Sequence, residues 1–102
     1  MFQPLDGPSS QIKLTSVGTV TPVEVKVGAD PLDDRQVITI QPTGNIRIWF
    51  ASSDTTPLAA TISANGFLHY KDAKESYEAG SKQKVWILAV SGTVDVIIAE
   101  RA

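Results

Sequence analysis

Few side chains in this sequence could carry out catalysis, and His69 is the first to consider. It is the single histidine, and the chain has no cysteine, so a Cys–His pair cannot form. A serine triad would need His69 as its base and a nucleophile held on a sharp turn, and no G-x-S-x-G sequence occurs. Because side chains alternate along a strand, His69 shares a face with Phe67. We interpret it as a packed or surface histidine and expect no catalytic residues.

Three carboxylates, those of Asp30, Asp33 and Asp34, gather in one loop that ends at Arg35. Clustered carboxylates can bind calcium, but this loop lacks the spacing of a calcium-binding loop and has Arg35 beside it. We interpret it as a solvated loop with an Asp–Arg pair and expect no metal site. The seven glycines lie singly at turns and form no phosphate-binding loop, so no cofactor is expected.

Charge and hydropathy narrow the possible partners. The formal net charge is −2, and the nine lysines and arginines are scattered along the chain. Nucleic-acid binding needs a basic patch, and none is visible. No apolar run approaches the roughly 18 residues of a membrane span, and the N-terminus has no basic start or apolar core of a signal peptide. We expect a soluble protein made in a cytoplasm, with no nucleic-acid or membrane partner.

The elements that must position these residues are strands. Apolar and polar residues alternate over residues 12–15, 23–27, 38–41 and 46–50, a pattern typical of strands with one buried face. A turn at residues 42–45 predicts a hairpin between the last two of these strands. We expect a brief strand at 76–78 rather than a helix over 72–79. The fold class is therefore all-β, an antiparallel sandwich or jelly-roll-like barrel of about seven to eight short strands.

The last two predicted strands, residues 84–90 and 93–100, are the clearest pair. Ser91-Gly92 separates them as a two-residue connection in which glycine supplies a positive φ, and we expect a hairpin. Both strands carry apolar residues on more than one face, which is typical of central strands that are covered on both sides. A loop, an N-terminal arm or another subunit must then cover the outer face.

Residues 1–10 are rich in proline, glycine and serine and are predicted to form an extended arm before a sandwich domain at 11–102. The arm is either a free tail or a strap that docks on a neighbouring subunit through Phe2 and Leu5. Trp49 is predicted to point outward from its strand, where it either contacts a partner or is covered by its own chain. Phe2, Leu5 and Trp49 are thus the candidate interface residues.

Four segments of the chain resemble small β-sandwich structural proteins of tailed-bacteriophage virions. They are the P-L-x-x-R-x-x-x-x-I-Q segment at 31–41, the strand after a turn at 45–50, the Gly-Phe strand start at 65–68, and the A-x-S-G-T-x-D-V-x-x-x-E ending at 89–100. The resemblance covers about residues 20–100, although Lys71-Asp72-Ala73-Lys74 stands where the family has a Pro-Gly turn. It implies a virion component without an active site, whose shared positions maintain the fold.

Three binding functions follow as hypotheses. The first is a capsid decoration or cement protein that binds the major capsid protein lattice as a homo-oligomer, with a trimer favoured. The second is a tail, baseplate or fibre-attachment component of a virion. The third is a carbohydrate-binding module with Trp49 as its stacking platform. In the first two cases the expected location is the virion, after synthesis in the host cytoplasm.

Overall fold

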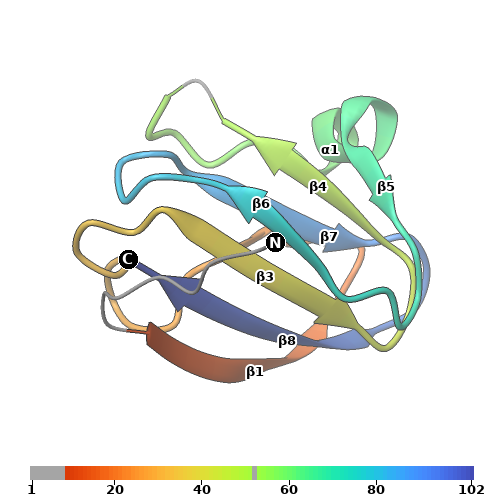
Figure 1. Ribbon diagram of the computed structural model, residues 1–102. Coiled ribbons are helices and arrows are strands. Elements are labelled where there is room, and N and C mark those ends of the chain that lie inside the picture. The colour runs from red at the N-terminus through yellow and green to blue at the C-terminus, as the bar shows by residue number, and fades with distance from the viewer. Residues whose placement is uncertain (1–8, 52) are drawn as a thin grey trace.

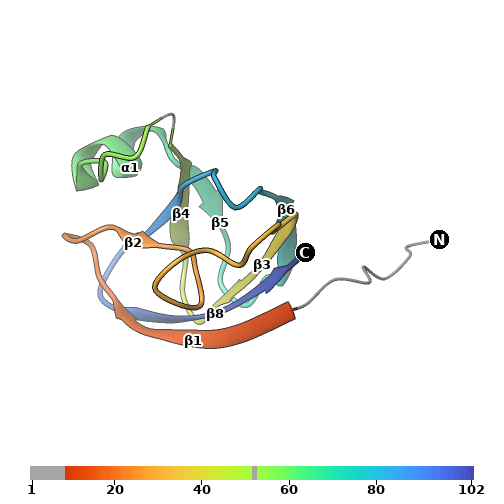
Figure 2. The same ribbon diagram turned by 90° about the vertical axis from the view of Figure 1, so that its left-hand side faces the viewer.

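Two four-stranded antiparallel sheets face each other in the computed structural model, which describes residues 9–51 and 53–102 (Figures 1 and 2). Sheet A has the strand order β1-β8-β3-β6, and sheet B has the order β2-β7-β4-β5. The elements are β1 (Ser9–Val17), β2 (Val23–Glu24), β3 (Val37–Pro42), β4 (Ile46–Phe50), α1 (Ala59–Asn65), β5 (Phe67–His69), β6 (Glu75–Glu78), β7 (Val85–Ala89) and β8 (Val94–Arg101). The predicted antiparallel β-sandwich is confirmed.

The core lies between the sheets and follows the alternation in the sequence. Ile38 and Ile40 of β3 face inward from sheet A, and Ile46 and Ile48 of β4 face inward from sheet B, all with no exposed surface. In β8 the even-numbered residues from Val94 to Glu100 are buried, while the residues between them are partly or fully exposed. Period-two burial of β-branched side chains is therefore what holds the two layers together.

The hairpins predicted at residues 42–45 and 91–92 are wrong. β3 pairs with β6 and β8 in sheet A, whereas the next strand, β4, pairs with β5 and β7 in sheet B. In the same way β7 belongs to sheet B and β8 to sheet A. Both turns carry the chain across the sandwich instead of back along one sheet. Gly92 does have the expected positive φ, of 60°.

The short helix α1 was not predicted. It lies outside residues 72–79, the segment for which a helix was considered and a strand preferred. The strand β6 occupies the end of that segment, as expected. α1 is alanine-rich, follows Pro57, and ends where the Gly66 N–H donates to the Ile62 carbonyl at 2.8 Å. It has a single buried residue, Ile62. One buried position in seven residues cannot show the spacing of three to four residues by which a helix is recognised in a sequence. No helix among the described residues is long and apolar enough to span a bilayer.

The first strand begins earlier than expected. β1 starts at Ser9, so the last two residues of the predicted arm belong to the sandwich. Residues 1–8, which include Phe2 and Leu5, lie outside the described residues. β1 pairs regularly with β8 from Ser9 to Leu14 and then shifts register at a bulge where Ser16 adopts a φ of 57°. β2 is shorter than predicted and covers only two residues.

Candidate interaction surfaces

Arg35 is a buried arginine whose five N–H donors are all used within the chain. Nε donates to the Ala79 carbonyl at 2.9 Å. One terminal nitrogen donates to the Val25 carbonyl and to Glu100, and the other to the carbonyls of Gly80 and Gln83, at 2.8–3.0 Å. The guanidinium therefore joins three separate segments of backbone to the end of β8.

Glu100 completes this cluster from the opposite side. Its carboxylate accepts from the Val27 N–H at 2.9 Å and from the Leu32 N–H at 3.2 Å, as well as from Arg35. A turn closed by the Arg35 N–H and the Leu32 carbonyl, with Asp34 in the left-handed region, aims Arg35 inward. The predicted solvated Asp–Arg pair is thus wrong, because Arg35 is buried against Glu100 while Asp33 and Asp34 stay exposed.

His69 is packed, one of the two alternatives that the sequence left open, and both of its ring nitrogens have partners. Nε2 lies 2.7 Å from the Ala73 carbonyl, which can only accept, so Nε2 carries a proton. Nδ1 lies 2.8 Å from the Tyr77 hydroxyl, which also lies 3.1 Å from a Glu75 carboxylate oxygen. The ring therefore fixes the turn that links β5 of one sheet to β6 of the other.

Tyr77 lies between His69 and Glu75 and has a perturbed acidity. Burial, the hydrogen bond to Glu75 and the charge of that carboxylate raise the pKa of Tyr77 to about 12. The tyrosine ring also packs near Phe50, with ring centroids 5.9 Å apart. His69, Tyr77 and Glu75 thus close the gap between the sheets on the side of β5 and β6. Since the hydrogen bonds of this network are made within the chain, we assign it a role in stabilising the fold.

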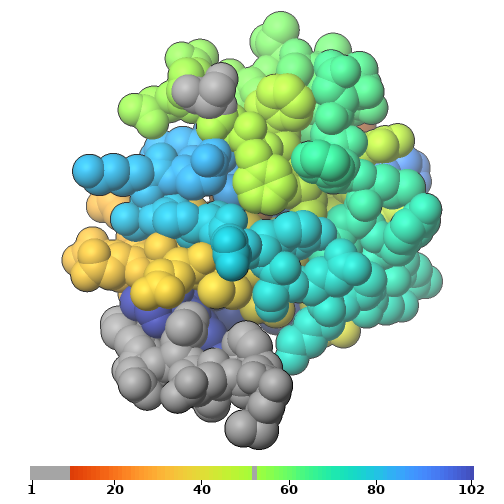
Figure 3. All heavy atoms as spheres, turned by 45° about the horizontal axis from the view of Figure 1, so that its top comes forward, coloured from red at the N-terminus to blue at the C-terminus, as the bar shows by residue number. Residues whose placement is uncertain are grey.

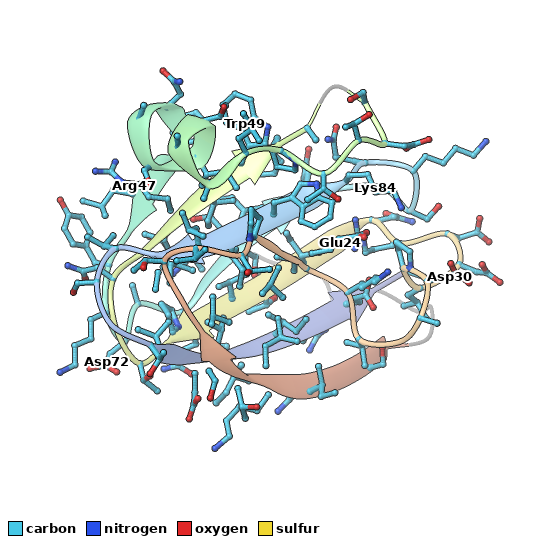
Figure 4. All side chains as sticks on the ribbon, turned by 180° about the vertical axis from the view of Figure 1, so that it is seen from behind. Glu24, Asp30, Arg47, Trp49, Asp72 and Lys84 are labelled. Atoms are coloured by element: carbon cyan, nitrogen blue, oxygen red, sulfur yellow. The ribbon has the colours of Figure 1, made fainter. Side chains whose placement is uncertain are left out.

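Trp49 does point outward from sheet B, but α1 covers part of it. Register places Trp49 directly beside Trp86 of β7, and both pack with Ile62 of α1 in a second hydrophobic cluster. Trp86 is buried, and its indole Nε1 has no hydrogen-bond partner among the described residues. Figure 4 shows Trp49 lying against the helix. The outer face of β7 is therefore covered by its own chain, one of the alternatives that the sequence left open.

A charged group borders the tryptophans on the same face. Glu24 of β2 is the register neighbour of Trp86, and its carboxylate lies 3.3 Å from the Lys26 ammonium and 3.5 Å from that of Lys84. Figure 4 shows Glu24 and Lys84 extending toward one another. These pairs are only partly exposed, and they close the β2 side of the tryptophan cluster.

Exposed apolar side chains border both faces of β5, a short edge strand, because Phe67 is in register with Ile48 and Leu68 with Arg47 on the opposite face. Phe67 is 71% exposed and Tyr70 is 65% exposed, with Leu68 between them at 38%. The Phe67 ring still meets that of Phe50 edge-on, with centroids 6.4 Å apart. Figure 3 shows this side of the molecule, where residues of β4, β5 and β6 meet. Partly exposed aromatic rings beside an edge are typical of protein contact surfaces.

The outer face of sheet A is exposed, and it carries both apolar and charged side chains. A shallow groove runs across β8 and β3, lined by Gln11, Thr39, Lys74, Ile97 and Arg101. The outer positions of β8 combine Ile97 and Ala99 with charged neighbours, so the apolar outer face expected for this strand stays partly exposed. The described residues contain no cluster of side chains that could hold a metal ion.

Of the three predicted interface residues, the structure describes Trp49 alone. Trp49 lies under α1, and Phe2 and Leu5 fall outside the described residues. Sequence reasoning missed the pairing of Arg35 with Glu100, which stand 65 positions apart. It also did not select Phe67 and Tyr70 as interface candidates, although both are strongly exposed.

Comparisons with known proteins give no family assignment. No family model matches the chain, and no curated protein matches it. One matching solved structure is described as "Bacillus endospore appendages form a novel family of disulfide-linked pili". It aligns over 99% of this chain and 96% of that chain, with 12% identity and a TM-score of 0.43. A likeness of this size carries no functional argument.

Proposed function

We propose that this chain is a non-catalytic structural protein that works by binding other protein surfaces. More specifically, we propose a decoration or cement protein on the major capsid lattice of a tailed bacteriophage. The virion assignment depends on the resemblance of residues 20–100 to small virion proteins. The sandwich fold agrees with that resemblance, and a rigid two-layer block is a suitable unit for a lattice.

The observation that carries the proposal is that the buried ion pair and the histidine make their hydrogen bonds within the fold. All five donors of Arg35 bind acceptors of this chain, and Glu100 accepts from two backbone N–H groups besides Arg35. Both nitrogens of His69 are likewise engaged. These charged and ring-nitrogen groups are the ones in the sequence that could take part in catalysis or ion binding. They bind loops of their own chain and do not face a substrate.

Contact with a partner is then assigned to the exposed edge of sheet B at β5 and the residue that follows it. Phe67, Leu68 and Tyr70 present aromatic and aliphatic area at the end of sheet B. Burying a side chain of this size contributes about 1.5–3 kcal/mol before ordering costs. On a lattice with many equivalent sites, modest contacts of this kind suffice, because multivalency raises retention without stronger individual contacts.

The test is to locate the protein in purified particles. Virions induced from the strain that encodes the chain are separated from DNA-filled heads that lack tails, and the protein is quantified in each fraction. We expect it on both virions and tail-less heads. Its presence on virions or free tails but not on tail-less heads would favour a tail or baseplate component. Its absence from every particle would contradict a virion function.

A second experiment maps the contact. Phe67→Ser and Tyr70→Ser are expected to reduce co-sedimentation with heads stripped of the protein, while Val20→Ser, at a loop residue that is 79% exposed, should leave it unchanged. The strap hypothesis for Phe2 and Leu5 is tested by removing residues 1–8, because a deletion to residue 10 would also cut into β1. Equal binding by the truncated chain would eliminate the strap.

The carbohydrate-binding hypothesis receives less support from the geometry. A sugar-stacking platform needs an open indole face, whereas Trp49 packs with Ile62, Trp86 and Leu88 beneath α1.

A further inference from the structure

The geometry points to self-association through β1: the strand pairs antiparallel with β1 of a second copy, centred on Ile12, and joins two A sheets into one. This inference is independent of the virion assignment, because it depends only on the edge of sheet A. It concerns an edge of sheet A, whereas Phe67 and Trp49 lie in sheet B.

β1 differs from the other three sheet edges in length. It has nine residues, whereas the edge strands β2, β5 and β6 have two, three and four. One side of β1 pairs with β8, and no other strand among the described residues pairs with its free side (Figure 1). A long strand edge with free backbone N–H and C=O groups is a template for another strand, and short edges are a common protection against such pairing.

The free side also lacks the residues that usually block such pairing. Residues 9–17 contain no proline and a single charge, that of Lys13. By register Lys13 faces outward beside Ile97, so it is not a charge aimed into the sandwich. The bulge at Ser16 disturbs only the C-terminal end of the strand, which leaves residues 9–14 in regular pairing with β8.

Apolar exposure along this edge gives a driving force for a second copy. Ile12 lies on the inner side of sheet A, opposite the buried Ile98, yet it is 41% exposed because no strand covers the edge. Leu14, two residues on, is half-buried on the same side. A strand added beside β1 would cover both side chains and satisfy the free backbone groups in the same step.

The identity of the occupant follows from the sequence of the strand. When two copies pair about Ile12, that residue meets its own counterpart, Ser10 meets Leu14, and Gln11 meets Lys13. Moving the centre to Lys13 would set two lysines directly opposite each other, which is unfavourable. The Ile12 register extends from Ser9 to Thr15, stops before the bulge, and forms about six to eight backbone hydrogen bonds. β1 is therefore complementary to itself, as a two-fold interface requires.

The first experiment is mass measurement by light scattering of the full chain over a wide range of concentrations. We expect a reversible dimer with twice the mass of one chain. Ile12→Lys should abolish the dimer while the far-UV circular dichroism stays unchanged, since Ile12 is partly exposed. A chain that remains monomeric at all concentrations, or one that forms a trimer unaffected by this substitution, would overturn the inference.

The register is tested by cross-linking, which is clean here because the natural chain has no cysteine. Ile12→Cys should form a disulfide-linked dimer under mild oxidation, since residue 12 faces itself across the two-fold axis. Thr15→Cys is the matched control: it lies on the same exposed strand but faces Ser9 of the second copy, so it should cross-link far less. Equal cross-linking of the two variants would show random collision and contradict the pairing.

A charge exchange provides a second check on the same contact. Ile12→Lys and Ile12→Glu should each be monomeric alone, because like charges would face each other. Mixing the two folded variants should restore a dimer that contains one chain of each kind. If the mixture stays monomeric although both variants are folded, residue 12 does not face itself and the inference fails.

Discussion

Arg35 and Glu100 stand 65 positions apart in the sequence and form a 2.8 Å ion pair in which neither side chain is exposed by more than 1%. The pair ties the loop before β3 to the end of β8. Around it, four carbonyls and two backbone N–H groups complete the hydrogen bonds of both side chains. Such complete satisfaction is what makes a buried charge pair tolerable.

Removing one member of this pair should be severe. We expect Arg35→Met to lower the free energy of unfolding by about 3–5 kcal/mol, because it leaves the Glu100 carboxylate buried without its counter-charge. Urea denaturation followed by circular dichroism measures the change. Lys82→Met, at an exposed residue, removes the same kind of charge and should alter stability little. Equal effects of the two substitutions would contradict a structural role for the pair.

Gly66 should not tolerate a side chain, because α1 meets β5 there. A Cβ atom at this position would lie 2.7 Å from the Ile62 carbonyl oxygen and 3.1 Å from that of Ile48, and backbone cannot move aside easily. We expect Gly66→Ala to destabilise the fold by about 1–3 kcal/mol. Gly18→Ala is the control, since its Cβ would meet nothing within 4 Å. Thermal unfolding of both variants distinguishes them.

The covering of the tryptophans by α1 should depend on Ile62. Ile62→Ala removes the one buried side chain of the helix, and we expect a loss of about 2–5 kcal/mol in the free energy of unfolding. Greater access of water to Trp49 and Trp86 should shift the tryptophan fluorescence to longer wavelength. Ser63→Ala, at an exposed position of the same helix, should change neither stability nor emission. An unchanged emission maximum in Ile62→Ala would show that α1 does not shield the indoles.

Tyr77 should make stability sensitive to alkaline pH. Its pKa is raised from 10.0 to about 12 in the folded chain, so the folded state keeps the proton in a range where the unfolded chain releases it. The stabilisation linked to this proton is complete below pH 10 and is lost as the pH rises toward 12. The unfolding free energy of the natural chain should therefore fall more steeply over this range than that of Tyr77→Phe. Tyr70→Phe is the matched variant, and an equally shallow fall for it would argue against the assignment.

Much of the secondary structure could be predicted from local pattern. The strand positions β3, β4, β5, β6, β7 and β8 follow from alternation and turn residues, because burial of one face of a strand leaves a period-two pattern in the sequence. The positive φ of Gly92 follows in the same way from its place in a tight turn. His69 was expected to share a strand face with Phe67, and the register of β5 with β4 places both on the same side.

Partner choice between strands was not predictable. A short turn such as 91–92 serves equally to return a strand within one sheet or to cross between two, and the difference lies in long-range pairing. The covering helix α1 was equally hidden, since one buried isoleucine in seven residues gives no period. The interface role of Trp49 could not be decided in advance, because burial of an outward residue depends on what the rest of the chain lays over it.

The sequence by itself determined the strands, the inward faces and the expectation of an antiparallel sandwich, since these depend on neighbouring residues. Only the tertiary structure decided that Arg35 meets Glu100, that α1 lies over Trp86, and that β1 is left with a free edge. The physical reason is the distance along the chain over which each interaction acts. Alternation and turn chemistry act over a few residues, whereas ion pairs, coverage and edges arise when segments far apart in the chain are brought into contact.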